Sequence, residues 1–431
     1  MRVVKQAGML FAVVFLLGAT SLSFADDAIV LPKGVWAVNF EDKIHLPITK
    51  RYGSDGKVED VATDFNQTLN SNIFPDLAVF EQPPFGLTSA NVGKSVTTFK
   101  YDFNILNVTI GRGITDKVSV GMKVPYWWAK NNVTAKLDTT NATVGVNPLY
   151  QQNVLPEQLN SAPFLPLGFL KSQGIPVDEI KLTTEDIQSL LGPGLDVDKN
   201  GTIDIPGYGY KRFETWSGEG FGDIEVGAKY KYYESVNWRL ALLGGMRFPT
   251  GRVDDPDNLT DYPFGTGAYA FLFNLNNDYV GIKDLVLDFT LRYDVYLPDH
   301  PTLRVPDDVN HPLTKNKEKV DRTYGNIFQA EVSAKYEFTK TTSASLLYRY
   351  GHGDKDKVSG SKGFNYKSLE EETNYREQIY IVGLAYTTVP LFVEKKFPVP
   401  LDASLSYRYR FAGANNVFQS EYFIANLTFY F

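Results

Sequence analysis

The sequence predicts an all-β protein, a transmembrane antiparallel β-barrel of about twelve strands with long extracellular loops. One observation is that polar and apolar side chains alternate along many segments, as between Asp223 and Tyr232. Another is that the turns are alternately short and long. A barrel with an even number of strands and both termini in the periplasm requires that arrangement.

A soluble sheet could alternate in the same way, with its apolar face packed on a second sheet or on helices. Here the pattern recurs along the whole chain, aromatic residues stand near the segment ends, and hardly any amphipathic helix could cover the apolar faces. The 26 Tyr and 29 Phe suit aromatic girdles at the two bilayer interfaces. We therefore expect lipid to cover the apolar faces.

Residues 1–25 have the pattern of a cleaved secretory signal peptide, although an uncleaved anchor is the alternative. Arg2 and Lys5 precede an apolar run at 7–18, and Ser23-Phe24-Ala25 supplies the cleavage pattern. The barrel would then occupy 26–431 in the outer membrane of a Gram-negative cell. No other stretch has the eighteen or so apolar residues of a spanning helix, so a spanning form must use strands.

The strand ranges follow from the alternation and the turns between them. They are 34–49, 96–112, 118–137, 223–232, 239–248, 265–275, 284–296, 328–338, 343–350, 378–391, 402–411 and 423–431. The polar parity of 96–112 changes near Leu106, which predicts a β-bulge. The connection 138–218 is expected to be a large extracellular loop insertion, and it and 51–95 could fold inward to constrict the pore. The last strand ends on Phe431 and resembles the signal read by the barrel-assembly machinery, although a soluble edge strand could end this way by chance.

Charged residues on the polar strand faces are the candidates for the pore lining. They are Lys100, Asp102, Lys123, Asp223, Glu225, Lys229, Lys231, Arg239, Arg247, Asp288, Arg292, Asp294, Glu331, Lys335, Glu337, Arg349, Arg408 and Arg410. Neither sign dominates. Such residues either pair with one another and rigidify the barrel or form facing rows that select solutes.

The segment Gly220–Tyr230 (GFGDIEVGAKY), followed after a turn by Phe248–Gly251 (FPTG), resembles the outer-membrane proteins grouped under the meta-pathway of phenol degradation. The resemblance implies a barrel that admits aromatic or hydrophobic compounds. It is specific to this hairpin, and the insertion at 138–218 is not expected of that family.

A possible calcium loop lies inside the insertion, at 196–204 (DVDKNGTID), after an expected helix at 184–191 capped by Thr183 or Thr184. The expected ligands are Asp196, Asp198, Asn200, Thr202 and Asp204, at the EF-hand spacing. Gly207 stands where the bidentate Glu belongs, and Glu214 could replace it. We expect a structural Ca²⁺ ion here, the alternative being an Asx turn without an ion.

The rest of the composition argues against several classes of function. The chain has no cysteine, and its net charge of −7 argues against nucleic acid as a partner. Its histidines, His45, His300, His311 and His352, have no nucleophile motif beside them, so an enzyme is not expected. We expect a passive channel for small molecules in the outer-membrane lipid. The alternative is a plugged barrel whose loops bind a surface partner, or one that sleeves a secreted or electron-transfer protein.

Overall fold

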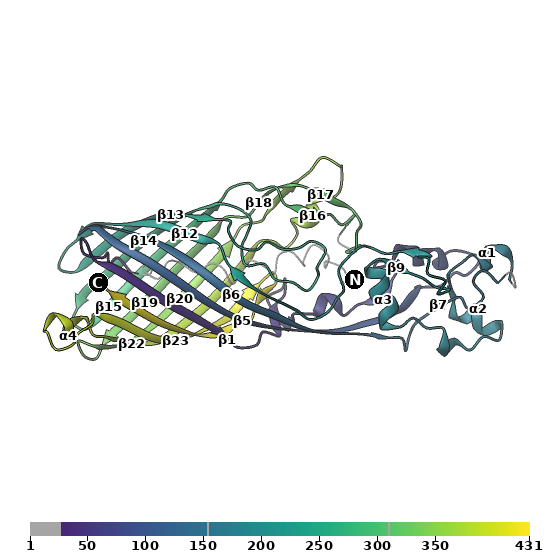
Figure 1. Ribbon diagram of the computed structural model, residues 1–431, viewed down its shortest axis with the longest axis horizontal. Coiled ribbons are helices and arrows are strands. Elements are labelled where there is room, and N and C mark those ends of the chain that lie inside the picture. Colours follow the sequence, from purple (N-terminus) through teal and green to yellow (C-terminus); the bar gives the residue numbers. More distant parts are fainter. Residues whose placement is uncertain (1–26, 153–154, 309–310) are drawn as a thin grey trace.

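The computed structural model describes residues 27–152, 155–308 and 311–431, so the expected signal peptide lies outside the described part. Within that part, twelve antiparallel strands form a closed ring, as predicted (Figure 1). In their order around the ring they are β1 (Trp36–His45), β5 (Asn91–Thr115), β6 (Val118–Asp138), β12 (Ile224–Glu234), β13 (Trp238–Phe248), β14 (Ala270–Ile282), β15 (Leu285–Tyr296), β19 (Ile327–Glu337), β20 (Thr342–Gly353), β22 (Tyr375–Thr387), β23 (Leu401–Ala414) and β25 (Glu421–Tyr430).

Shorter elements fill the connections. The strands are β2 (Lys50–Tyr52), β3 (Val58–Asp60), β4 (Thr68–Asn70), β7 (Val144–Val146), β8 (Phe164–Pro166), β9 (Gly194–Leu195), β10 (Ile205–Pro206), β11 (Trp216–Phe221), β16 (Thr302–Arg304), β17 (Lys317–Lys319), β18 (Asp321–Thr323), β21 (Lys357–Ser359) and β24 (Val417–Phe418). The helices are α1 (Glu157–Asn160), α2 (Leu167–Ser172), α3 (Thr184–Leu191) and α4 (Val389–Val393), with 3₁₀ turns η3 (Thr63–Phe65), η4 (Pro75–Glu81), η5 (Val177–Glu179) and η6 (Tyr366–Leu369). No helix in the described ranges has both the length and the apolar character needed to cross a bilayer.

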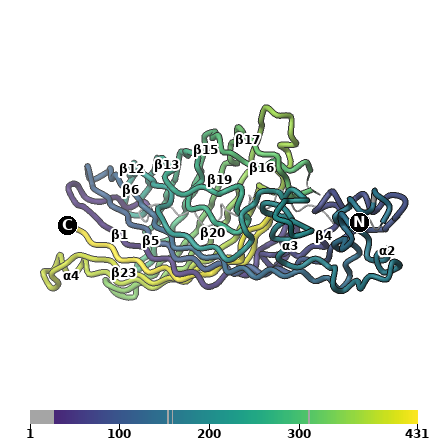
Figure 2. The backbone as a smooth tube through the Cα atoms, turned by 45° about the vertical axis from the view of Figure 1, so that its right-hand side comes forward, coloured from purple at the N-terminus to yellow at the C-terminus, as the bar shows by residue number. Residues whose placement is uncertain are grey.

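The strands β5 and β6 are much longer than the others and continue past the barrel wall as a two-stranded extension (Figures 1 and 2). Their pairing is regular from Lys94 to Gly113, so the β-bulge expected near Leu106 is wrong. The odd-numbered side chains of both strands face inward along the whole length. The change of polarity at Leu106 therefore has another cause.

That cause is a change of surroundings along one strand. On the outer face of β6, apolar Val120 and Met122 give way to Trp128 and then to Lys130 and Thr134. Outer side chains are apolar where they meet lipid and polar where they meet water, and Trp favours the interface between the two. The polarity inversion on β5 and β6 thus marks the membrane surface.

This boundary predicts how a charge is tolerated along the outer face of β6. Met122→Lys places a cation in the lipid-facing part of the strand and is expected to destabilise the folded barrel by about 2–4 kcal/mol. Thr134→Lys, on the same face above the boundary, is expected to change it by less than about 0.5 kcal/mol. Equilibrium unfolding in lipid vesicles measures both, and equal losses would contradict the assigned boundary.

The extension carries a distal domain, which we define as the described residues of 66–92 and 139–213. Both segments contribute to a single hydrophobic core, with Leu77 and Phe80 from the first and Val144, Leu165 and Leu170 from the second. Figure 1 shows this domain beyond the open end of the barrel, at the far end of β5 and β6. Most of the insertion at 138–218 therefore builds a separate lobe instead of constricting the pore.

Candidate functional site

The end of the barrel nearer the distal domain is filled by a cluster of buried, mostly aromatic side chains, here called the mouth cluster. Its members are Ile48, Val61, Ala62, Phe99, Tyr101, Phe103, Ile105, Trp127, Ala129, Phe213, Tyr262, Phe264 and Phe418. They come from the inner faces of β5 and β6 and from four connections. Of the two long loops expected to fold inward, 51–95 contributes Val61 and Ala62 to this cluster and 138–218 contributes Phe213.

Lys100 and Asp102 were expected to face the lumen, and this is wrong. Lys100 is exposed on the outer face of β5, and Asp102 accepts a hydrogen bond from Asn132 (2.8 Å) on the same face. The neighbouring aromatic residues Phe99, Tyr101 and Phe103 face inward instead. Above the membrane the inner face of the strand is apolar because it packs in the mouth cluster.

Two acidic residues of the connection between β13 and β14 lie close to this cluster. Burial, and then the neighbouring carboxylate of Asp261, raises the pKa of Asp254 well above its usual range. Asp261 also forms an ion pair with Arg252, whose guanidinium lies 5.0 Å from the ring centroid of Trp216. Burial and the second carboxylate thus favour the neutral form of Asp254 beside an aromatic surface.

Most of the other candidate residues lie buried in the barrel interior. These are Lys123, Asp223, Glu225, Lys229, Arg247, Asp288, Arg292, Glu331, Arg349, Arg408 and Arg410, with Asp294 slightly more exposed. Lys231 pairs with Glu234 and Arg239 with Asp278 nearer the periplasmic end. Lys335 and Glu337 pair with each other at that end of β19 and are nearly half exposed.

The interior charges pair along the barrel wall, from one strand to the next. Glu225 binds Lys123 on one side (2.7 Å) and Arg247 on the other (2.8 Å), and Arg247 also reaches Asp294 (3.1 Å). Further around the wall, Arg349 binds Glu331 at 2.6 Å. The sequence left open whether these charges pair and rigidify the barrel or form facing rows that select solutes. The arrangement is the paired one.

Other interior partners were not recognised in the sequence. Glu41 pairs with Lys43 on β1, and Glu377 on β22 pairs with Arg410. The first pair could have been predicted from the alternation of β1, because Glu41 and Lys43 have the same parity and so lie on the same face. The facing of β22 could not be read from its sequence, so Glu377 was missed.

The N-terminal segment 27–35 lies inside the periplasmic half of the barrel. The Ala28 amide donates to Asp278 (2.9 Å), the Leu31 amide to Ser119 (2.7 Å), and Lys229 donates to the Asp27 carbonyl (2.8 Å). Gly113 permits this path, because a Cβ atom there would lie 2.0 Å from the Pro32 carbonyl oxygen. Sequence reasoning missed the segment, since nothing in an extended stretch states which strands it will touch.

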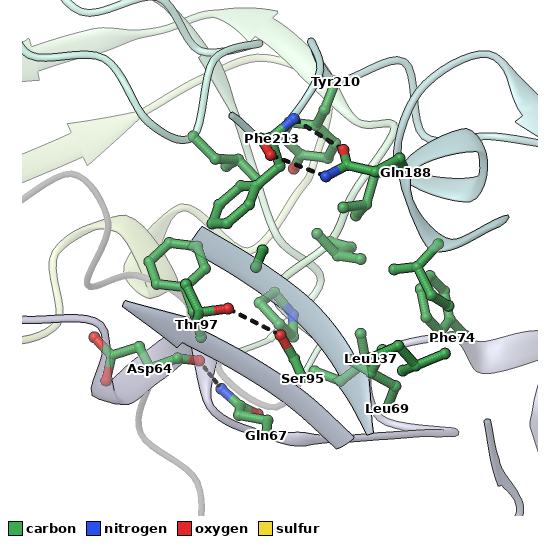
Figure 3. Close-up of a pocket in the computed structure, with 18 of the residues that line it drawn as sticks. Asp64, Gln67, Leu69, Phe74, Ser95, Thr97, Leu137, Gln188, Tyr210 and Phe213 are labelled. Carbon is green, nitrogen blue, oxygen red and sulfur yellow. Dashed lines mark hydrogen bonds between the residues drawn. The ribbon is translucent and has the colours of Figure 1, made fainter. Parts of the chain in front are cut away.

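A mostly apolar pocket of about 140 Å³ lies above the mouth cluster, where the barrel meets the distal domain (Figure 3). Its walls come from the inner faces of β5 and β6, from the 64–74 segment, from α3, from 210–213, from 256–259 and from Arg304, Pro306, Pro312 and Leu313. Phe65 and Phe213 line the pocket and pack on each other at 5.1 Å, and Phe65 packs on Phe99 of the mouth cluster at 4.8 Å. The pocket and the mouth cluster are therefore one continuous apolar surface.

Hydrogen bonds fix the upper wall of the pocket. Thr183, one of the two caps expected from the sequence, caps α3 with a capping box, and α3 carries Gln188. The Gln188 side chain donates to the Phe213 carbonyl (2.9 Å) and accepts from the Phe213 amide (3.0 Å), as Figure 3 shows. Burial raises the pKa of Tyr210, partly offset by Arg304, whose guanidinium lies 3.9 Å from its ring centroid. Polar groups in this wall thus hold the pocket in shape.

The expected calcium loop brings three carboxylates together. Oxygen atoms of Asp196, Asp198 and Asp204 lie within 4.8 Å of one another. The Gly201 amide donates to Asp196 (2.8 Å), which is the turn that the motif requires. Glu214, the suggested replacement for the twelfth ligand, pairs with Arg212 at 3.4 Å. The donor set therefore fits Ca²⁺ over the first nine positions only.

The closed ring with its apolar outer band defines a membrane β-barrel. The family model described as "Putative MetA-pathway of phenol degradation" matches residues 178–415, more than half of the chain. The protein belongs to this family. No curated protein matches the sequence.

The solved structures to which the chain is similar include a channel and a transporter. The COG4313 outer membrane channel from Pseudomonas putida F1 has a TM-score of 0.49 and 10% identity, over 96% of this chain and 99% of that one. The Pseudomonas putida toluene transporter TodX has a TM-score of 0.32 and 10% identity, over 100% of this chain and 98% of that one. Similarities of this size carry no argument about what this chain binds.

Proposed function

We propose that the protein is a passive outer-membrane channel for small, mainly apolar molecules about the size of one aromatic ring. The observation that carries this proposal is the apolar pocket of about 140 Å³, continuous with the mouth cluster. A cavity of about 150 Å³ lined by apolar side chains is large enough to bind benzene. The pocket would receive the molecule outside the membrane, and rearrangement of the mouth cluster would admit it to the lumen.

The direction that this arrangement favours is uptake, because the pocket lies on the extracellular side of the mouth cluster. We also propose that residues 1–25 are a cleaved signal peptide and that the barrel resides in a Gram-negative outer membrane. The last strand would be recognised there by the barrel-assembly machinery. The lipid-facing band of β6, with Met122 and Trp128, supports the membrane location.

The pocket is tested by filling it. Ala135→Trp places an indole into the pocket from the inner face of β6, and we expect about tenfold weaker binding of a neutral aromatic probe such as toluene, equal to about 1.4 kcal/mol. Thr134→Trp puts the same side chain on the outer face of the adjacent position and serves as the control. Binding to the refolded protein is measured by calorimetry. Unchanged affinity in Ala135→Trp would remove the pocket from the proposal.

A plugged barrel that binds a surface partner is the second candidate. It is favoured by the closure of both ends, with the mouth cluster at one and residues 27–35 at the other, and by the separate core of the distal domain. Planar-bilayer recordings separate the two candidates. A plugged barrel stays silent, whereas a channel shows opening steps that aromatic solutes alter.

We propose that the loop at 196–204 binds a structural Ca²⁺ ion of modest affinity. The three carboxylates of Asp196, Asp198 and Asp204 support this. Calcium is expected to protect the distal domain from proteolysis in the wild type and not in Asp196→Ala. Protection that is equal in both proteins would indicate an Asx turn without an ion.

A further inference from the structure

The lumen contains one arginine whose surroundings differ from those of its neighbours. Arg410, Arg349 and Arg247 each bind a carboxylate, at 2.7, 2.6 and 2.8 Å. Arg408 on β23 is only 4% exposed, and no carboxylate of the described residues lies within ion-pair distance of it. Its closest polar contact is the Ser420 hydroxyl at 3.4 Å, and its Nε makes no hydrogen bond within the described chain.

A buried guanidinium without an opposing charge is costly, because the desolvation penalty of an ion amounts to several kcal/mol. The charges nearby do not remove this cost. Arg292 and Arg349 share the single carboxylate of Glu331, and Glu377 is bound by Arg410. None of these carboxylates forms an ion pair with Arg408 among the described residues, which favours an anion from outside the chain.

A second buried group lies beside Arg408. Both ring nitrogens of His45 are buried and without a hydrogen-bond partner in the described residues, and His45 is 7% exposed. Its ring lies 4.1 Å from that of Tyr422, and the Arg408 guanidinium lies 4.8 Å from the same Tyr422 ring. His45 on β1 and Arg408 on β23 therefore both contact Tyr422 of β25, the strand that lies between theirs.

This group stands at the inner end of the aromatic surface that begins in the pocket. The ring of Phe99 lies 6.0 Å from that of Tyr101, Tyr101 stacks on Phe103 at 5.6 Å, and Phe103 contacts His45 at 5.9 Å. The inner face of β5 thus connects the apolar pocket with the polar group in the lumen. A ligand that follows this surface meets Arg408 and His45 when it enters the barrel.

We propose that Arg408 and His45 form a carboxylate-binding site in the lumen, so that the molecules carried include small aromatic acids. The carboxylate would accept hydrogen bonds from the guanidinium and the imidazole, as charge-assisted bonds of this kind are strong. The ring would pack against Tyr422 and Phe103. This inference rests on the proposed channel and specifies the polar end of its substrate.

The experiment compares benzoate with benzyl alcohol, its neutral analogue of nearly the same size, and with acetate. Calorimetry gives the affinities for the refolded full chain, and solute entry into proteoliposomes gives the transport. Arg408→Gln keeps most of the side-chain volume and removes the charge. Lys231→Gln is the control, because it removes a lumen-side cation near the periplasmic end that is paired with Glu234.

We expect Arg408→Gln to weaken benzoate binding about tenfold or more. Benzyl alcohol binding and entry should stay unchanged, and Lys231→Gln should alter neither. Arg408→Gln should also fold at least as stably as the wild type in a denaturant titration, because it removes a buried charge that lacks an opposing carboxylate. His45→Phe should weaken benzoate binding in the same direction.

Two results would overturn the site. One is benzoate affinity that Arg408→Gln leaves unchanged. The other is acetate binding as strongly as benzoate, which would indicate an anion filter without a place for the ring. Failure of the channel itself has a different result, since benzyl alcohol would then enter wild-type proteoliposomes no faster than protein-free liposomes.

Discussion

Replacing Gly113 by leucine is expected to raise the ionic conductance of the barrel several-fold. The new side chain would occupy the path of the N-terminal segment, since even a Cβ atom there lies 2.0 Å from the Pro32 carbonyl oxygen. The segment would leave its place and expose the periplasmic half of the lumen. Deletion of residues 27–33 should have the same effect by removing the segment itself. Single-channel recordings in planar bilayers measure the change.

The matched control for this prediction is Ile114→Leu. Ile114 is the next residue of β5, and its side chain is 45% exposed on the outer face of the strand. Its conductance should equal that of the wild type. If Gly113→Leu and the deletion both conduct like the wild type, the N-terminal segment does not limit the pore.

The second large effect concerns the carboxylate shared by two strands. Glu331→Gln is expected to destabilise the barrel by about 3–5 kcal/mol, because it removes the charge that opposes Arg292 and Arg349 while both remain buried. The glutamine keeps the shape of the side chain, so the loss reports charge and not packing. Equilibrium unfolding in lipid vesicles measures it.

Glu337→Gln on the same strand provides the comparison. Glu337 pairs with Lys335 where both side chains are nearly half exposed, and an exposed pair contributes at most about 1 kcal/mol. A similar loss in both variants would mean that the interior of the barrel is as well hydrated as its rim. The wall pairs would then contribute little to stability.

The barrel itself was predictable because the alternation of polar and apolar residues along a strand reflects what each of its two faces contacts. Strands such as β12 and β15 place their charged residues inside and their apolar residues outside, as expected. The same rule gave a wrong prediction for Lys100 and Asp102, because it assumes that each face of a strand has the same surroundings along its whole length. β5 leaves the lipid partway along its length, so its outer face turns polar there without any change in pairing.

The pocket and the N-terminal segment could not be predicted, because both depend on contacts between distant parts of the chain. Leu69, Ala135, Gln188 and Phe213 line one pocket from four separate segments. None of these residues has a local signal of ligand binding. The capping of α3 by Thr183 was predictable because a helix cap is a local feature, and it positions one pocket wall.

The central claim is that apolar solutes pass from the extracellular pocket through the barrel. The most direct measurement is the entry of a neutral aromatic solute, benzyl alcohol, into proteoliposomes that contain the refolded full chain. Entry should be faster than in protein-free liposomes, slower in Ala135→Trp and unchanged in Thr134→Trp. Entry no faster than in protein-free liposomes, with correctly folded protein in the membrane, would contradict the account.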